Sequence, residues 1–360
     1  MTKTELKHLR SELEKIDERI ISLFEERAKI SVAIGKLKQE HGLNIYDPAQ
    51  EAKVYAYLEK KNKGLLPTRA LKAIFREIIS ISRELQSPIT VAHLGPEASF
   101  AHMAALSHFG TSARFFPQAN VFRVFDEIER GKVQWGVVPV ENSLEGSVNL
   151  TLDRLILTPL KIRAEIFLKI SHCLLSSGDK LEAISKIYSH PQAFAQCQSW
   201  LRANLPAGSL IETESTASAA HAVLGDKHSA AIGSRLAATA YGLNVLSEGI
   251  EDNPSNTTRF LVIGKGENTT TGKDKMSMLF ATPHSPGALC RALAPFAERD
   301  INLLKIESYP VKEKTWDYLF FVDVSGHQKD LKIRECLKEL QQKTTFLKIL
   351  GSYPWGEGAA

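Results

Sequence analysis

A single long helical pattern at the N-terminus constrains the fold of this chain more than any other feature of its sequence. Apolar side chains recur there at steps of three and four residues, and no proline interrupts the pattern before Pro48. These side chains are Leu6, Leu9, Leu13, Ile16, Ile20, Leu23, Phe24, Ile30, Ile34 and Leu37. A helix of about 35 residues is too long for one small domain to cover, so we expect a second copy of the chain to pack against the apolar stripe.

Two shorter helical patterns complete the N-terminal segment. Gly42 is expected to end the long helix, and further helices follow over residues 49–61 and 69–86. Together the three patterns predict an all-α domain over residues 1–88.

The pattern changes after this segment. From residue 90 to 264, short apolar strands alternate with helical stretches, which predicts parallel sheets in an α/β domain over residues 89–268. Residues 161–175 are expected to form one long strand that crosses between two lobes. After a polar linker, residues 274–360 follow the order strand, helix, strand, strand, helix, strand, which is the βαββαβ pattern of a ferredoxin-like α+β domain. The sequence therefore predicts a multidomain chain.

Composition excludes several classes of function. The formal charge of +4 is small and spread along the chain, which argues against a nucleic-acid partner. No apolar run approaches the roughly 18 residues that a membrane-spanning helix needs. The four cysteines are far apart in the sequence, without the paired spacing of a zinc site, and are typical of buried thiols in a reducing cytosol. We therefore expect a cytoplasmic protein with no metal and no membrane partner.

A polar cluster follows one of the predicted strands. Residues 135–140 are apolar and rich in valine, as in a short buried strand, and Glu141, Asn142 and Ser143 are expected in the loop at its carboxyl end. Ligands bind at such ends in open α/β sheets. A carboxylate, an amide and a hydroxyl suit a small polyoxygenated ligand whose proton must be moved. The alternative is a capped turn before a helix at residues 149–155.

Polar side chains follow other predicted strands as well. Ser189 ends one strand, and the next residues open a helix that carries Gln196. Between them, His190 is either a general acid or a structural residue of the turn. Residues 256–260 lead into the last strand of the segment.

The long helix also carries a candidate site for a dianion. Arg27 and Lys38 are 11 residues apart, close to three whole turns, so they share one face about 16 Å apart and could bracket a dicarboxylate. Arg10 lies roughly 25 Å from Arg27 and could reach the same ligand only from an antiparallel partner chain. Ser82 and Gln86 are four residues apart and form one polar patch on the third helix. Taken singly, each of these residues is more typical of a solvated polar group, and only their joint pattern favours a site.

Together these residues resemble the all-α chorismate mutase family. The matching residues are Leu9, Arg10, Ile16, Asp17, Glu26, Arg27, residues 34–38, Tyr46, Asp47, Pro48, Glu51, Ser82 and Gln86. The resemblance implies that Arg27 and Lys38, with Arg10 from the other subunit, hold the carboxylates and ether oxygen of chorismate. The reaction is a pericyclic rearrangement, so it needs a held conformer and charge stabilisation rather than a nucleophile.

The same resemblance assigns roles to the remaining polar residues. Gln86 would assist Lys38 at the ether oxygen, and Ser82 would contact a carboxylate. Asp47 and Glu51 would face the ring hydroxyl. Gln50 stands where the family usually carries an arginine, which removes a cation near this site.

The α/β segment resembles prephenate dehydratase along its whole length. The matching motifs are residues 94–97, 141–143, 189–192, 196–197 and 258–260. The resemblance implies a site between two α/β lobes, with Asn142, Ser189, Gln196 and Thr258 binding or acting on prephenate. Thr258 would lie nearest the chemistry, with Arg259 supporting it. Because the ring hydroxyl leaves as water while carbon dioxide is lost, the departing oxygen needs a proton or a hydrogen bond, and Glu141 and Thr258 are the candidate donors.

The C-terminal segment resembles the ACT domain attached to prephenate dehydratases. Two phenylalanine-contact motifs match at residues 287–290 and 306–310, supported by residues 316–318 and 326–327. The implied effector contacts are Gly287, Ala288, Leu289, Glu307 and Ser308. Tyr309 stands where the second motif normally has an arginine. The resemblance implies that phenylalanine binds at a dimer interface and inhibits the dehydratase; the alternative is a dimerising domain without a ligand.

Taken together, these resemblances imply a chain of the bifunctional chorismate mutase–prephenate dehydratase family with an ACT domain, and we expect it to form a homodimer or higher homo-oligomer. Its expected ligands are chorismate, prephenate and phenylalanine, and no cofactor or metal is implied. One alternative is a monofunctional dehydratase with a weak or structural mutase domain, which Gln50 favours. Another is a binding protein, because two-lobed α/β segments also occur in solute receptors.

Overall fold

The computed structural model describes residues 3–43, 45–310 and 318–356. They form two compact units: one comprises residues 1–47, 58–89 and 109–114, and the other comprises residues 48–57, 90–108 and 115–360. None of the helices in these described ranges is both long enough and apolar enough to cross a membrane.

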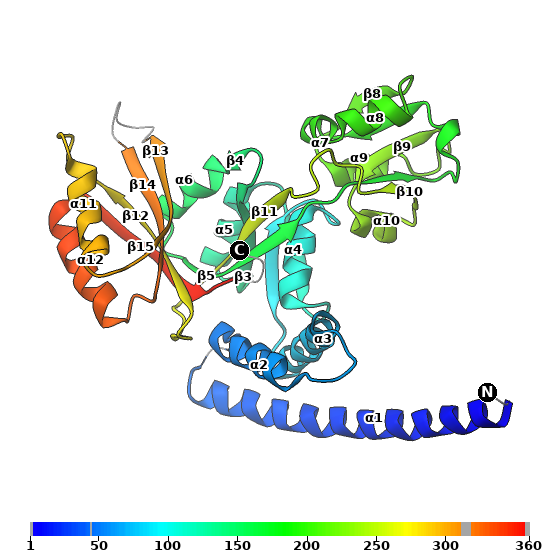
Figure 1. Ribbon diagram of the computed structural model, residues 1–360, viewed down its shortest axis with the longest axis horizontal. Coiled ribbons are helices and arrows are strands. Elements are labelled where there is room, and N and C mark those ends of the chain that lie inside the picture. The colour runs from blue at the N-terminus through cyan, green and yellow to red at the C-terminus, as the bar shows by residue number, and fades with distance from the viewer. Residues whose placement is uncertain (1–2, 44, 311–317, 357–360) are drawn as a thin grey trace. The chain divides into compact units, whose positions relative to one another are not determined.

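The first unit is helical, as the sequence predicts. Helix α1 (Lys3–Glu40) packs against α3 (Thr68–Gln86), and α2 (Pro48–Lys61) lies between them in the sequence and contributes to both units (Figure 1). The bounds agree closely with the predicted helices because proline and threonine start signals and amphipathic periodicity are local properties.

Helix α1 leaves its apolar stripe exposed. The ten apolar side chains of the stripe are each at least 38% exposed, and only Ser31 and Gly35 are buried among the residues of α1. Helices in proteins gain most of their stability from packing of an apolar face, and a bare stripe of this length is typical of a surface that another helix covers.

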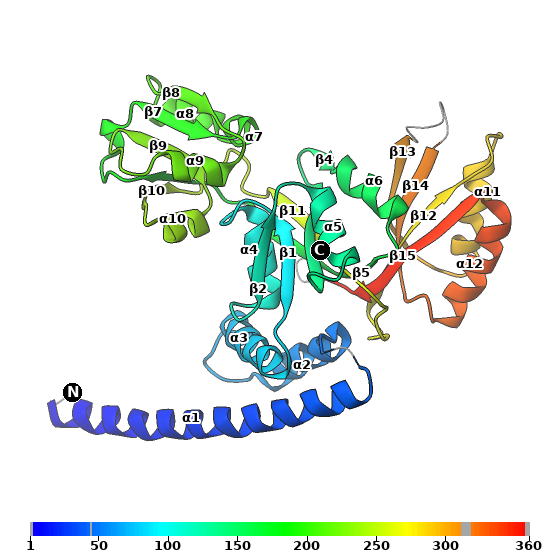
Figure 2. The ribbon, with the colours of Figure 1, turned by 180° about the vertical axis from the view of Figure 1, so that it is seen from behind.

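The second unit begins with a sheet of strand order β2-β1-β3-β11-β5, with β4 paired to β3. Strand β1 runs parallel to β3, whereas β11 runs antiparallel to both of its neighbours. Figure 2 shows α5 against this sheet. The elements are β1 (Thr90–Leu94), α4 (Phe100–Phe109), β2 (Arg114–Gln118), α5 (Val121–Glu129), β3 (Trp135–Asn142), β4 (Gly146–Ser147), α6 (Asn149–Leu157), β5 (Lys161–Lys169) and β11 (Thr257–Gly264).

A second sheet has the order β10-β6-β9-β7-β8. Strands β7, β8 and β9 run parallel to their neighbours among themselves, and β6 runs antiparallel to both β9 and β10. The elements are β6 (Cys173–Ser176), the short 3-10 helix η1 (Leu181–Ala183), β7 (Lys186–Ser189), α7 (Pro191–Gln196), α8 (Gln198–Asn204), β8 (Ser209–Glu212), α9 (Thr216–Ala222), β9 (Ser229–Gly233), α10 (Arg235–Tyr241) and β10 (Asn244–Glu248).

Two predictions about this segment are wrong. The sheets are mixed rather than parallel, and the expected single strand over residues 161–175 is two strands that belong to different sheets. Both differences have one cause: the chain leaves the first sheet after β5 and returns to it before β11. Outgoing and returning strands that lie side by side must run in opposite directions, so β5 and β11 pair antiparallel.

The C-terminal sheet has the order β13-β14-β12-β15, with every neighbouring pair antiparallel. Helices α11 and α12 pack together and share a core with the sheet. This arrangement confirms the predicted βαββαβ pattern, although residues 316 and 317 of the predicted third strand lie outside the described residues. The elements are β12 (Asp274–Ala281), α11 (Ala288–Ala297), β13 (Leu303–Pro310), β14 (Tyr318–Ser325), α12 (Leu331–Lys343) and β15 (Phe346–Pro354).

Candidate active sites

Two of the predicted mutase residues meet between α1 and α3. The Arg27 guanidinium donates to the Ser82 hydroxyl, which in turn donates to the Ile78 carbonyl at 2.7 Å. Burial between the two helices lowers the pKa of Arg27. A partly buried guanidinium with one bound hydroxyl retains further N–H donors, which is the arrangement an anionic ligand requires.

Gln86 is fixed by close packing of the same helices. A Cβ atom on Gly35 would lie 2.7 Å from Gln86 Cγ, so only glycine allows α1 and α3 to approach this closely. Lys38, one turn further along α1, donates to the Ile45 carbonyl at 2.8 Å.

Three further predicted mutase residues lie on α1 and around the start of α2. Arg10 is exposed near the other end of α1, Asp47 is half-buried before α2, and Glu51 lies in the first turn of α2. Their roles stay predictions.

Asn142 and Thr258 form a cross-strand pair. They lie opposite each other on the antiparallel strands β3 and β11, and Asn142 Nδ2 donates to Thr258 Oγ1 at 2.9 Å. Glu141 and Asn142 were expected in a loop, but they are the last two residues of β3, because pairing with β11 on one side and β4 on the other extends the strand.

Further side-chain amides extend the hydrogen bonding from the Asn142–Thr258 pair. Asn142 Nδ2 also donates to Asn256 Oδ1 at 2.9 Å, and Asn256 Nδ2 donates to Gln196 Oε1 at 3.0 Å. Gln196 Nε2 donates to Glu145 Oε1 at 3.2 Å. The structure thus brings three predicted residues, Asn142, Gln196 and Thr258, into one hydrogen-bonded network.

The network contains residues that the sequence did not single out. Asn256 is fully buried, and His172 is 2% exposed with its Nε2 atom 3.0 Å from Gln196 Oε1. The position of Asn256 two residues before Thr258 was a usable signal. No such signal pointed to His172, because residues 161–175 were expected to form one regular strand.

Ser189 and His190 make hydrogen bonds outside this network. The Ser189 hydroxyl is buried at the end of β7 and donates to the Ile232 carbonyl of β9 at 3.0 Å. His190 caps α7, where its Nδ1 accepts from the Gln192 amide at 3.3 Å. These contacts favour the structural alternative for His190.

Arg259 lies in a buried cluster of charges that joins the first sheet to the C-terminal sheet. Its Nε is 2.9 Å from Glu165 Oε2, and its Nη1 is 2.7 Å from Asp323 Oδ2. Lys275 Nζ contacts Glu165 Oε2 at 2.8 Å, and all four charged side chains are at most 7% exposed. Burial alone would lower the pKa of Arg259, but neighbouring Tyr353, Asp323 and Glu165 outweigh it and raise that pKa. Two cations and two carboxylates balance, as buried charges must.

Glu141 pairs with a residue of the C-terminal sheet. Its Oε2 atom lies 2.8 Å from Lys305 Nζ and 3.8 Å from Arg259 Nη1. An ion-paired carboxylate accepts hydrogen bonds and has no proton to donate. This geometry favours Thr258 over Glu141 as the donor to a leaving group.

Alternate residues of β13 face the first sheet. Glu307 accepts from the Ser147 hydroxyl and lies 3.0 Å from Lys305 Nζ, while the Tyr309 hydroxyl donates to Asp153 of α6. Burial and this carboxylate raise the pKa of Tyr309 to about 12. Ser308 is exposed on the opposite face of the strand. Tyr309 is therefore a packing residue of this contact.

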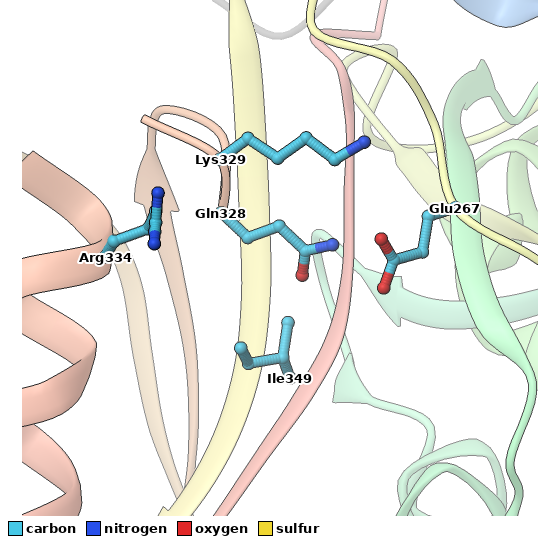
Figure 3. Close-up of a pocket in the computed structure, with 5 residues that line it drawn as sticks. All are labelled: Glu267, Gln328, Lys329, Arg334 and Ile349. Carbon is cyan, nitrogen blue, oxygen red and sulfur yellow. The ribbon is translucent and has the colours of Figure 1, made fainter. Parts of the chain in front are cut away.

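Gly287 caps α11 with a positive φ of 72°, a conformation that favours glycine, and Ala288 after it is buried. A separate cavity of about 310 Å³ contains none of the predicted site residues. Figure 3 shows Gln328 and Glu267 pointing toward each other there. Its lining is Glu267, Gln328, Lys329, Arg334 and Ile349. Within the described ranges, no group of three or more histidine, cysteine, aspartate or glutamate side chains could hold a metal ion.

Comparisons with known proteins match three families along this chain. Models of three families match: chorismate mutase type II at residues 9–87, prephenate dehydratase at residues 91–268 and the ACT domain at residues 280–342. A bifunctional chorismate mutase/prephenate dehydratase of Aquifex aeolicus is 48% identical, over 97% of this chain and 98% of the relative. One of Stutzerimonas stutzeri is 42% identical, over 97% of this chain and 98% of the relative. A solved structure of a prephenate dehydratase from Arthrobacter aurescens, in complex with L-Phe, is 34% identical with a TM-score of 0.68 and covers 74% of this chain and 90% of that one.

Proposed function

The chain belongs to the bifunctional chorismate mutase/prephenate dehydratase family, and on this premise we propose which of its residues perform the two reactions. It converts chorismate to prephenate and prephenate to phenylpyruvate. The domains that carry these reactions span residues 1–88 and 89–268, and an ACT domain spans residues 274–360.

The mutase site is shared between two copies of the chain. Arg27 and Lys38 of one copy bind the carboxylates and ether oxygen of chorismate, and Arg10 reaches the same ligand from the antiparallel α1 of the other copy. The exposed apolar stripe of α1 supports this proposal, because a partner helix would cover it. Ser82 orients Arg27, and Gln86, Asp47 and Glu51 complete the polar lining.

The dehydratase proposal rests on one observation, the orientation of the Asn142–Thr258 hydrogen bond. Asn142 Oδ1 accepts from the backbone amides of Leu144 and Glu145, so its Nδ2 must be the donor to Thr258 Oγ1. The Thr258 oxygen is then occupied as an acceptor, and its own hydrogen finds no acceptor among the described residues. That hydrogen is free to bond to the departing ring hydroxyl of prephenate.

The other dehydratase residues hold this donor in place. Gln196 extends the amide network. The Ser189 hydroxyl joins β7 to β9 within the second sheet through its hydrogen bond to the Ile232 carbonyl. Arg259, next to Thr258, anchors β11 through Glu165 and Asp323. Loss of carbon dioxide and aromatisation of the ring provide the driving force, so no metal or cofactor is required.

Phenylalanine inhibits the dehydratase through the ACT domain, with Gly287, Ala288, Leu289, Glu307 and Ser308 as its contacts. Lys305 offers a physical connection, because its ammonium binds both Glu307 and the end of the catalytic strand at Glu141. An effector that engages Glu307 would change this pairing, which couples the two sites. Calorimetry with phenylalanine, tyrosine and tryptophan tests this; binding of none of them would leave the ACT domain as a dimerisation module.

One incubation tests the combined function. Purified protein is mixed with chorismate, and chorismate loss and phenylpyruvate formation are followed together. Both should proceed without added metal or cofactor. Conversion of prephenate but not of chorismate would support a monofunctional dehydratase with a structural helical domain. Turnover of neither compound would support a binding protein.

A further inference from the structure

The dehydratase network has a fixed direction of hydrogen-bond donation that begins at the backbone. The amides of Leu144 and Glu145 can only donate, at 3.0 and 3.2 Å, so they require Asn142 to present its Oδ1 atom. The Asn142 Nδ2 group must therefore donate to both Thr258 Oγ1 and Asn256 Oδ1. This backbone anchor removes the usual ambiguity between the oxygen and nitrogen of a side-chain amide.

The same direction continues to a histidine. Since Asn256 Oδ1 is an acceptor, its Nδ2 group donates to Gln196 Oε1. Gln196 Nε2 donates to the Glu145 carboxylate, which independently requires the same amide orientation. Gln196 Oε1 can then only accept from His172, whose Nε2 is 3.0 Å away. His172 must therefore carry its proton on Nε2.

His172 is built into the protein as this tautomer. The side chain is 2% exposed, its ring packs edge-on with Phe100 at 5.4 Å between centroids, and its backbone amide donates to Glu251 Oε2 at 2.8 Å. Its Nδ1 atom is buried without a partner among the described residues. An acceptor left unsatisfied at this depth is a cost that a merely packed side chain would avoid, which indicates that the donor at Nε2 is needed.

We propose that His172, as the Nε2–H tautomer, is a positioning residue of the dehydratase site: its hydrogen bond holds the Gln196 side chain in place and, through Asn256, supports the Asn142 amide that donates to Thr258. This inference rests on the dehydratase function proposed above. In this role His172 transfers no proton to the substrate. It needs only an N–H group at Nε2, which both the neutral Nε2–H imidazole and the imidazolium have.

Two amide variants separate a donor at the place of Nε2 from a donor at the place of Nδ1. In His172→Gln the side-chain amide nitrogen can occupy the place of Nε2, whereas in His172→Asn it can reach only the place of Nδ1. We expect His172→Gln to keep prephenate kcat within about threefold of the wild-type value and His172→Asn to lower it by about tenfold or more, with a smaller change in KM. His172→Leu should behave like His172→Asn.

Further measurements distinguish the proposed role from a loss of folding and from proton transfer. Near-UV circular dichroism and urea unfolding of each variant report whether the α/β domain has folded, and His228→Asn, which changes an exposed histidine of the same lobe, is the matched control. The pH profile of kcat should be the same in wild type and His172→Gln; Glu251 and Glu145 are the charged groups next to this part of the network. Nitrogen NMR of histidine-labelled wild type should show the Nε2-protonated form.

Three results would overturn the proposal. They are equal kcat in His172→Gln and His172→Asn, loss of one limb of the pH profile in His172→Gln, and an Nδ1-protonated neutral His172. A wild-type protein that does not convert prephenate would instead refute the function on which this inference rests.

Discussion

His93 is the buried residue whose protonation most directly connects pH with stability. It lies fully buried on β1, with its ring stacked on His102 at 4.6 Å between centroids. Burial is the main reason that the pKa of His93 falls to about 4, and the neighbouring His102 lowers it further, although a hydrogen bond to the Leu94 carbonyl acts in the opposite sense.

The folded state therefore loses stability in acid. Between pH 6.5 and about 4 the unfolded chain protonates this histidine while the folded chain does not, so protons favour unfolding across that window. We expect His93→Asn to lose less free energy of unfolding between pH 7 and pH 4 than wild type does, by at most about 3 kcal/mol. Urea unfolding at several pH values measures this, with His228→Asn as control. Parallel pH dependence in wild type and His93→Asn would show that His93 is not responsible.

Individual site residues differed in how far sequence could predict them. Three residues lie within short sequence motifs and could be predicted: Asn142, Gln196 and Thr258. The structure joins them in one hydrogen-bonded network. His172 could not be predicted, because its role depends on a contact with Gln196 across 24 positions of the chain. Tyr309 stands where the second motif normally has an arginine, and only the structure shows that its hydroxyl donates to Asp153.

Helices α1 and α3 meet where a residue without a side chain allows it. Gly35 lies against Gln86, and an added methyl group would come within 3.0 Å of Gln86 Cα as well as its side chain. The helix bounds were predictable because amphipathic periodicity is local. The direction of β11 was not, because it depends on the second crossing of the chain between the two sheets.

Gly35→Ala should disturb this helix pair selectively. The new methyl group must push α3 away or displace Gln86, which we expect to destabilise the helical domain by roughly 1–3 kcal/mol and to lower mutase kcat/KM. Dehydratase activity should remain, and Lys36→Ala at the exposed neighbouring position serves as control. Mutase activity equal to that of Lys36→Ala would mean that the helices adapt without cost.

At the scale of the whole molecule, the proposed mutase site is completed by a second copy of the chain. A mixture of Arg10→Ala and Arg27→Ala chains should recover mutase activity, because each mixed dimer contains one site with both arginines and one with neither. Random exchange makes half of the dimers mixed, so about one quarter of wild-type activity is expected. Size-exclusion chromatography of differently tagged chains verifies exchange. Activity no higher than that of the separate variants, after verified exchange, would place each site within one chain.

The central claim is that one chain performs two consecutive reactions, the second through the Thr258 hydroxyl. Its most direct test supplies chorismate to Thr258→Ala and follows chorismate, prephenate and phenylpyruvate together, with the adjacent Thr257→Ala as control. We expect chorismate to be consumed at the wild-type rate and prephenate to accumulate, because dehydration should lose about 100-fold or more in kcat without the hydroxyl. Phenylpyruvate formed as fast as in wild type would contradict the claim.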